Sequence, residues 1–351
     1  MITGWPCGVR SDTTCGDAAV AGIGNVSGML ATFVTSLSPD DPLSALQVGD
    51  RPSPVVPDGW ARVRVKAASL NHHDLWSLRG IGLPADRLPM ILGCDAAGID
   101  EDGNEVVVHA VIGDPDYRGD ETLDPKRSLL SERYQGALAD EVVVPRRNLV
   151  PKPASLSWVE AACLPTAWLT AYRMLFTQSG LKPGDTVLVQ GAGGGVATAL
   201  IRLGSAAGMR VWVTSREQDK RERAIDLGAA QVFDSGARLP DRVEAVMETV
   251  GAATWTHSVR SLRPGGTIVI SGATSGPNPA ATELNRIFFL QLRVIGSTMG
   301  TREELGRLLR FCEITGVRPV IDCVLPLEEA RDGFAKLEAG DVVGKVVFTR
   351  P

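Results

Sequence analysis

Two kinds of hydrophobic spacing divide the chain. From Met29 to about Val150, short apolar runs alternate with turn residues, as at 61–65, 105–108 and 141–144. Regularly spaced short strands of this kind indicate an all-β module. From Leu181 onward, strand-like runs instead alternate with stretches of helical spacing, which is typical of a parallel sheet with helices on both faces. The spacing therefore predicts two modules of different class.

The second module is predicted to contain six strands. A helix at 158–176 precedes them and another at 303–313 follows, and the tail 321–348 returns to β-type runs around one short helix. We expect the tail to complete the first module. The predicted strands lie at 186–190, 210–215, 230–233, 244–248, 267–271 and 292–297.

The first of these strands runs into a glycine-rich turn, Gly191-Ala-Gly-Gly-Gly195, and a helical pattern begins directly after it. Glycines let a backbone approach phosphates closely, and a helix N-terminus offers free N–H groups and the positive end of a dipole. Ala197 stands where a third glycine is usual, and the next strand lies at the distance that a dinucleotide fingerprint requires. The pattern predicts a dinucleotide pyrophosphate at Gly193, Gly194, Gly195 and Val196.

The tip of the second strand favours NADPH over NADH. An NAD site usually places Asp or Glu there to accept from the ribose 2′-hydroxyl, but this tip holds Ser215 and Arg216, with Lys220 one turn into the next helix. A hydroxyl and two cations suit a 2′-phosphate. Alternatively, these cations belong to a solvated helix start, and Glu217 would repel a phosphate if it pointed inward.

Composition excludes several classes of protein. The 351 residues carry 36 Lys and Arg against 41 Asp and Glu, with a net charge of −5 and no long run of one sign. Neither nucleic acid nor a membrane surface is therefore an expected partner, and no window approaches the apolar length of a membrane span. Six scattered cysteines favour a reducing compartment, so we expect a cytoplasmic protein. Residues 1–28 lack both periodicity and a signal-peptide pattern, and we expect a disordered extension there.

The ordered motifs of the chain resemble those of the medium-chain dehydrogenase/reductase superfamily, which includes zinc alcohol dehydrogenases and zinc-free quinone reductases. The resemblance implies an α/β fold with a GroES-like β-barrel domain at 29–167, completed by 301–351, and a Rossmann doubly wound parallel sheet at 168–300. It also implies a cleft for a small-molecule substrate, and a homodimer, since the last strand has a free edge. Besides the glycine turn, the motifs lie at 67–74, 92–98, 136–140, 169–172, 262–266, 296–300 and 344–348.

The chain departs from the zinc-containing branch of that superfamily. The positions that match its catalytic zinc ligands hold Asn71, Cys94 and Thr166, and a catalytic zinc needs three good protein ligands. The loop 113–134, which matches the structural zinc lobe, has no cysteine. We therefore expect no metal. Another donor set within reach of the same cleft comprises His72, His73, Asp74 and His109.

Loss of zinc changes the expected chemistry. Without a Lewis acid nothing lowers the pKa of an alcohol, so its direct oxidation is harder. The resemblance to zinc-free relatives implies hydride transfer from NADPH to an activated C=C bond or a quinone, with hydrogen-bond donors supporting the enolate. Two alternatives stay open, a zinc-type alcohol or aldehyde dehydrogenase and a non-catalytic NADPH-binding regulatory protein. The proton donor is left open between water, Tyr117 and Tyr134.

The resemblance also implies a set of site residues. Asn71 matches an asparagine beside the nicotinamide that donates to an enolate or a ribose; otherwise it bonds its own backbone. Asp74 either orients Asn71 or His72 or caps a helix, and Cys94 is either a reactive thiol or a small buried filler. Further cofactor contacts are expected at Thr170, Val250, Gly272, Ala273, Thr274, Ser297, Thr298 and Met299.

Overall fold

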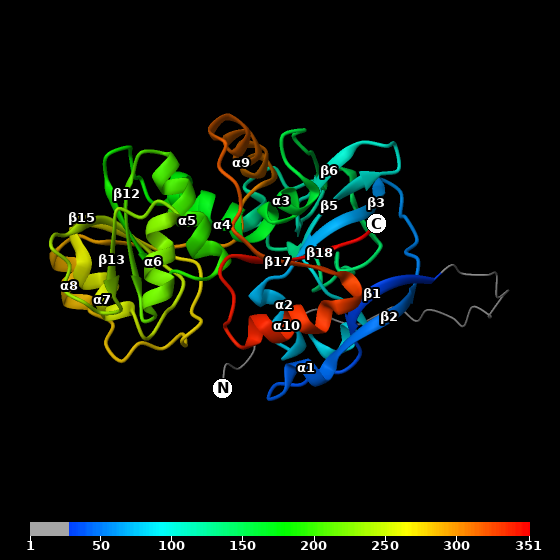
Figure 1. Cartoon of the computed structure of the whole chain (residues 1–351), viewed down its shortest axis with the longest axis horizontal. Helices are drawn as coiled ribbons and strands as arrows, with labels where there is room; N and C mark the ends of the chain where they lie inside the picture. Colours follow the sequence, from blue (N-terminus) through cyan, green and yellow to red (C-terminus); the bar gives the residue numbers. More distant parts are fainter. Residues whose placement is uncertain (1–27) are drawn as a thin grey trace.

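The computed structural model describes residues 28–351 as two modules that lie side by side along the long axis of the molecule (Figure 1). The extension expected at 1–28 falls, except for its last residue, outside the described residues. That last residue, Gly28, is instead the first residue of strand β1 (Gly28–Val34), because its backbone continues a ladder in which it pairs with Pro52.

The barrel module is built around one long central strand, β3 (Trp60–Ser69), which pairs antiparallel with three neighbours. Its main sheet has the strand order β10-β6-β5-β3-β18-β17, with β9 also paired to β3. The neighbours in this sheet are β5 (Asp95–Asp100), β6 (Glu105–Val108), β9 (Glu141–Pro145), β10 (Leu149–Pro151), β17 (Ile321–Pro326) and β18 (Lys345–Thr349). Smaller sheets contain β1, β2 (Leu46–Pro52) and β4 (Met90–Ile91), and β7 (Val111–Ile112) with β8 (Ser128–Leu129).

The C-terminal tail is part of this barrel. Strand β18 pairs antiparallel with β3, for example Val347 with Ser69, and Figure 1 shows the red tail running beside the blue strand β3 of the first half of the chain. The end of the sequence therefore meets residues that lie almost 300 positions earlier. The domain boundaries expected at 167 and 300 stay a prediction.

The second module is a six-stranded parallel sheet with the order β13-β12-β11-β14-β15-β16. The order reverses direction beside β11, and in doubly wound sheets ligands bind outside the carboxyl ends of the strands at such a point. All six expected strands are confirmed, with ends shifted by a few residues: β11 (Thr186–Gln190), β12 (Arg210–Ser215), β13 (Gln231–Asp234), β14 (Val243–Glu248), β15 (Leu262–Ile270) and β16 (Arg293–Gly296).

Helices pack on both faces of this sheet and around the barrel. The helix after the glycine turn, α5 (Gly195–Ala206), buries Leu200, Ile201 and Leu203 on one side, as its spacing predicts. The other helices of the Rossmann module and its exit are α6 (Gln218–Asp226), α7 (Trp255–Ser261), α8 (Leu284–Phe289) and α9 (Arg302–Thr315). The barrel carries α1 (Pro42–Ala45), α2 (His72–Leu78) and α10 (Ala330–Glu338), with 3₁₀ turns η1 (Ala85–Arg87), η2 (Glu121–Leu123), η3 (Arg146–Asn148) and η6 (Leu327–Glu329).

The helix expected at 158–176 is interrupted. Helix α3 (Trp158–Ala162) ends before Pro165, which has no N–H to donate and whose ring clashes with a preceding carbonyl. The chain then follows a π-helical turn η4 (Leu164–Trp168), a short α4 (Leu169–Tyr172) and a second π-helical segment η5 (Arg173–Gln178).

The interrupted segment lies in the core that joins the two modules. Trp168 is fully buried, and it belongs to one apolar cluster with Ala67 and Ala97 of the barrel and Val187 and Val189 of the Rossmann sheet. Within the described part of the chain, no helix is long and apolar enough to cross a membrane.

Candidate active site

The glycine turn leads from β11 directly into α5. Gly191 has a φ of +85°, a conformation that disfavours any residue with a side chain. A Cβ added to Gly194 would meet no atom within 4 Å, so the turn is open there. The first bond of the helix runs from the Thr198 N–H to the Gly194 carbonyl. The N–H groups before Thr198 are thus without helical partners, which is the arrangement that binds phosphate.

The residues expected to discriminate NADPH from NADH differ in whether their charge is already neutralised by a neighbouring residue. Lys220 Nζ lies 2.8 Å from the Glu217 carboxylate, so much of its charge is already compensated. Glu217 accordingly faces Lys220. The exposed Arg216 has no ion-pair partner among residues 28–351, and the Ser215 hydroxyl accepts a hydrogen bond from the Glu217 N–H at 3.3 Å. A 2′-phosphate in this position would therefore meet Arg216 as the uncompensated cation.

The other expected cofactor residues, apart from Thr170, lie near the carboxyl ends of the strands. The Val250 carbonyl accepts from Ser275, and the Thr274 hydroxyl donates to the Thr249 carbonyl. A Cβ on Gly272 would lie 3.0 Å from the Thr249 carbonyl oxygen, and Ala273 contacts the position of a Cβ on Gly251, so these loops pack tightly. The Ser297 hydroxyl is buried with no hydrogen-bond partner in the described chain, and Thr170 is buried in α4.

Thr298 and Met299 line a cavity of about 310 Å³ between the two modules. Barrel residues form the rest of the wall, and the lining combines apolar side chains with hydroxyls and two charged groups. The lining comprises Val111, Thr122, Arg127, Ser128, Leu129, Glu132, Thr298 and Met299. A larger hollow of about 700 Å³ lies over α8 and the loop before it, and none of the expected site residues lines it.

Asp74 caps a helix and ties it to a neighbouring turn. Its Oδ2 accepts from the Asn71 N–H at 2.9 Å, which completes a capping box at the start of α2. Its Oδ1 accepts from the Gly93 N–H at 2.9 Å. Burial raises the pKa of this carboxyl, against the opposing charge of His73. Of the two roles left open for Asp74, the capping role is the one that these contacts fulfil.

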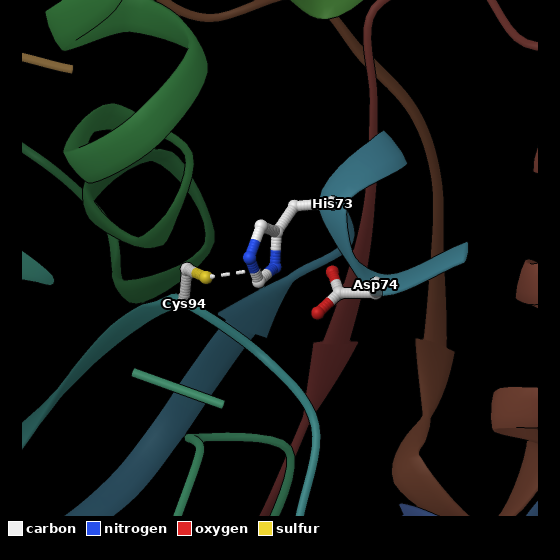
Figure 2. Close-up of side chains that lie close together, drawn as sticks. All are labelled: His73, Asp74 and Cys94. Atoms are coloured by element: carbon white, nitrogen blue, oxygen red, sulfur yellow. Dashed lines mark hydrogen bonds between the residues drawn. The ribbon is translucent and has the colours of Figure 1, made fainter. Parts of the chain in front are cut away.

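Cys94 lies in the turn that follows Gly93, against the side chain of His73 (Figure 2). Its sulfur is 3.4 Å from His73 Nδ1, 3.2 Å from the Leu130 carbonyl oxygen and 3.7 Å from the Ser131 hydroxyl. The thiol is fully buried, and it packs with Val111, Leu129 and Met299 of the cavity wall. Cys94 therefore sits directly behind the cavity, in polar contact with an imidazole.

The other ring nitrogen of His73 contacts Glu132. Nε2 and the Glu132 Oε1 are 3.1 Å apart, and Glu132 itself lines the cavity. Burial raises the pKa of Glu132, but its hydrogen bonds from His73 and Leu129 outweigh burial and lower it. The carboxylate is thus charged, and Nε2 donates to it. Figure 2 shows the ring held between Cys94 and the end of α2.

Both partners make His73 a better base. Burial lowers the pKa of His73, but the electrostatic effect of Cys94, the hydrogen bonds to Cys94 and Glu132 and the charge of Asp74 together raise it well above 6.5. Burial raises the pKa of the Cys94 thiol, which the nearby His73 only partly offsets. The Cys94 thiol donates its S–H to the Leu130 carbonyl.

The carboxamide of Asn71 is held by two buried charges. Lys345 Nζ donates to its Oδ1 at 2.6 Å, and its Nδ2 donates to Asp95 Oδ2 at 2.9 Å. Asp95 Oδ2 also accepts from Ser69 at 2.8 Å and lies 3.3 Å from Lys345 Nζ. Lys345 and Asp95 were not among the residues expected from the sequence. Their signal was a charged residue in an otherwise apolar run, as in Lys345-Val-Val-Phe348.

The positions that match a catalytic zinc site do not fit zinc. Asn71 faces the ammonium group of Lys345, which repels a second cation, and Thr166 offers only a neutral buried hydroxyl. A different set, His73, Asp74 and Cys94, brings one ligand atom each to within 4.8 Å of one another. These are donor types that zinc accepts, although both Asp74 oxygens already accept backbone N–H groups. The alternative set expected from the sequence is not formed, because His72 is exposed and His109 Nε2 contacts the Gly300 carbonyl.

Comparison with known proteins agrees with this architecture. A family profile described as an alcohol dehydrogenase GroES-like domain matches residues 57–154, and one described as a zinc-binding dehydrogenase matches residues 195–313. A zinc-type alcohol dehydrogenase-like protein of Schizosaccharomyces pombe is 31% identical over 83% of this chain and 90% of its own length. The chain belongs to the medium-chain dehydrogenase/reductase superfamily. It is an oxidoreductase of that superfamily, and its α/β fold with a GroES-like barrel and a Rossmann sheet is the one expected.

Members similar to this oxidoreductase differ in their substrates. An acryloyl-coenzyme A reductase of Sulfurisphaera tokodaii is 28% identical over 81% of this chain and 90% of the relative. The crystal structure of an NAD-dependent alcohol dehydrogenase has a TM-score of 0.85 at 35% identity and covers 92% of this chain and 100% of its own. The 2-octenoyl-CoA carboxylase reductase CinF, in complex with NADP and 2-octenoyl-CoA, has a TM-score of 0.84 at 26% identity and covers 92% of this chain and 87% of its own.

Proposed function

We propose that this oxidoreductase reduces an activated carbon–carbon double bond, or a quinone, by hydride transfer from NADPH without a metal ion. The observation that carries the proposal is the Asn71 carboxamide bound to the buried Lys345 ammonium group, at a position where zinc-containing relatives have a ligand. Acryloyl-CoA and 2-octenoyl-CoA reductases among the similar proteins support a C=C acceptor, and the NADP of the latter supports the phosphorylated cofactor.

NADPH, which the glycine turn at 193–196 would hold, would supply the hydride that forms a C–H bond with the electron-poor carbon of the acceptor, and would be left as NADP⁺. The π electrons move toward the conjugated carbonyl, whose oxygen becomes negative, and a proton then completes the product. Hydrogen-bond donors in the cleft lower the energy of that enolate. Asn71 is the donor that we assign to this role.

We propose His73 as the source of the proton. Its Nε2 lies 3.1 Å from Glu132 in the wall of the cavity, and its contacts raise the pKa of the imidazole. The two tyrosines considered from the sequence are less suitable. Tyr134 packs against Trp60 at a ring distance of 5.2 Å, and Tyr117 is on an exposed part of the loop. We also propose a cytoplasmic location, which is supported by the free state of the four cysteines in residues 28–351.

A second candidate, a metal-dependent alcohol or aldehyde dehydrogenase, is favoured by one observation, the approach of His73, Asp74 and Cys94. Oxidation of NADPH is therefore measured against enones, enoyl thioesters, quinones and aldehydes, with NADH in parallel and with and without a chelator. We expect turnover of an enone, enoyl thioester or quinone. Its rate should be higher with NADPH than with NADH and unchanged by the chelator. Chelator-sensitive turnover of aldehydes or alcohols alone would establish the second candidate, and binding of NADPH without turnover would indicate a regulatory protein.

A further inference from the structure

The C-terminal tail passes over the dinucleotide turn just before it enters the barrel. The Gly344 N–H donates to the Gly193 carbonyl at 2.8 Å. The next side chain, Lys345, is 2% exposed and its stem lies against Gly195, where an added Cβ would come within 3.0 Å of Cδ. Two consecutive residues of the tail therefore contact the turn expected to hold the cofactor.

The ammonium group of Lys345 has no proton left to offer a substrate. It donates to the Leu70 carbonyl at 2.7 Å and to Asn71 Oδ1 at 2.6 Å, and its third N–H faces Asp95 Oδ2 at 3.3 Å. A lysine has three N–H donors and no acceptor, so all of its hydrogen-bonding capacity is used. Any hydrogen bond that supports the reaction here must therefore come from a residue that Lys345 holds.

Of the three groups that Lys345 contacts, only the Asn71 carboxamide has N–H donors of its own. One N–H of the Asn71 carboxamide donates to Asp95 at 2.9 Å, whereas the other reaches the Ser69 carbonyl only at 3.4 Å. That second N–H is the donor least committed within the protein. A cation on the amide oxygen draws electron density from the nitrogen and strengthens its N–H groups as donors, because hydrogen bonds in a chain polarise one another.

We propose that Lys345 is a positioning residue for hydride transfer, which fixes and polarises the Asn71 carboxamide so that its second N–H supports the oxygen that becomes negative in the acceptor. The inference rests on the proposed function. It assigns to a buried ammonium, acting through an amide, part of the charge stabilisation that a metal ion would supply.

A double-mutant cycle between Lys345 and Asn71 tests this inference. Lys345→Met keeps the alkyl stem on Gly195 but removes the charge, and it would leave the Asp95 carboxylate unpaired in the core. Asp95 Oδ1 already has no hydrogen-bond partner in the described chain, so the cycle is built on Asp95→Asn to keep the variants folded. Its members are D95N alone and with K345M, with N71A, and with both.

We expect K345M to lower kcat about 10- to 100-fold for a weakly activated enone, and by a smaller factor for a strongly activated quinone. The Kd of NADPH should stay within about threefold of its original value, because methionine keeps the alkyl stem on Gly195. N71A should abolish the further effect of K345M. Additive losses, an equal loss with every acceptor, or a loss confined to NADPH affinity would each overturn the inference. The cycle uses whichever acceptor wild-type protein turns over, so failure of the C=C assignment shows first in the acceptor panel.

A matched control and a spectroscopic readout complete the test. Lys336 is also a lysine of the tail paired with an aspartate, Asp322, but outside the cleft, so K336M should leave kcat unchanged. The Asn71 carboxamide ¹⁵N–¹H signals, assigned by their loss in N71A, should shift in K345M and not in K336M. Unchanged signals in K345M would contradict the contact, and absence of turnover with every acceptor would overturn both the inference and the proposed function.

Discussion

His73 is held in the cleft by two contacts of opposite kind, a carboxylate at Nε2 and a buried thiol at Nδ1. Burial lowers the pKa of His73, but the contacts with Cys94 and Glu132 and the charge of Asp74 together outweigh burial and raise it. In an unfolded chain the same imidazole has a pKa of about 6.5. Folding therefore binds a proton more tightly at this position, and stability is linked to pH.

The His73→Asn variant should reveal this linkage. Because the folded pKa is higher than the unfolded one, the contribution of His73 is fully present below about pH 6.5 and is lost as pH rises through the folded pKa. Urea unfolding between pH 5.5 and 9 should show the largest difference in free energy of unfolding at the acid end. If His73 supplies the proton, kcat of wild type should fall over the same upper range.

The neighbouring histidine is the control for that measurement. Desolvation and the nearby charges of Lys345 and Arg79 lower the pKa of His72. This shift is opposite in sign to that of His73, so His72→Asn should gain rather than lose stability toward low pH. A His73→Asn difference that is constant with pH, or that grows toward pH 9, would contradict the raised pKa.

Arg216 makes the second prediction at this scale. If it binds the 2′-phosphate, Arg216→Ala removes a charge-assisted hydrogen bond and should lower kcat/KM for NADPH about 10- to 100-fold while leaving NADH unchanged. Lys220→Ala should have a smaller effect, because Lys220 is already paired with Glu217. Equal losses with both cofactors would argue against a phosphate at Arg216.

The sequence identified some site residues and missed others for a physical reason. Asn71, Asp74 and Cys94 stand in contiguous motifs, so they were found, although the catalytic roles of Asn71 and Cys94 stay predictions. The partners that determine their chemistry lie far away in the chain: Lys345 is 250 positions from Asp95, and Glu132 is 59 from His73. Such pairs depend on how the C-terminal tail and the loop 113–134 pack against the rest of the barrel, which local spacing does not specify.

At the scale of elements, the tail before β18 contains two glycines that are required for different reasons. Both Gly340 and Gly344 have positive φ, +75° and +100°. A Cβ on Gly340 would meet nothing within 4 Å, whereas a Cβ on Gly344 would lie 2.3 Å from the Val320 carbonyl oxygen. The first glycine is needed for its backbone angle alone, and the second also for space.

Alanine at each position should separate these two requirements. Gly340→Ala should cost about 1–2 kcal/mol of stability, the usual price of a left-handed residue. Gly344→Ala should cost clearly more, and it should weaken NADPH binding because Gly344 also bonds Gly193. Denaturant unfolding and NADPH titration measure both effects. Equal costs at the two positions would mean that the tail relaxes around the added methyl group.

The elements were predictable where burial alone determines them. The central strands β11, β12 and β14 of the Rossmann sheet are buried on both faces, so they read as nearly continuous apolar runs and are placed correctly. The stretch 158–176 is helical as expected, apart from Cys163, but the pattern of apolar residues does not register the missing N–H of Pro165 that divides it. The π-helical turns on either side of α4 have no signature in that pattern.

At the scale of the whole molecule, helix α8 lies at the end of the Rossmann module remote from the barrel (Figure 1), and it carries exposed apolar side chains. Strand β16 is the edge of its sheet, and beside it Leu284, Phe288 and Phe289 are between 66% and 78% exposed. Large exposed apolar groups beside a free sheet edge mark association surfaces. We propose that a second copy of the chain covers this surface, as the expected homodimer requires.

Light scattering tests the proposed homodimer directly. Wild-type protein should have twice the mass of the 37.2 kDa chain, and Phe289→Glu combined with Val294→Lys should give the monomer mass with unchanged circular dichroism. Val294 lies in β16 itself and is 44% exposed. A monomeric wild type, or a dimer that tolerates both charges, would place the interface elsewhere or remove it.

The most direct test of the account follows deuterium from the cofactor into the product. Metal-depleted protein is given NADPH labelled with deuterium at the transferred C4 position and an α,β-unsaturated thioester or ketone, and the product is examined by NMR. The account predicts a saturated product with deuterium on the β-carbon, formed at the same rate with or without added zinc. Deuterium on a carbinol carbon, or formation of product only after zinc is restored, would contradict metal-free reduction of a double bond.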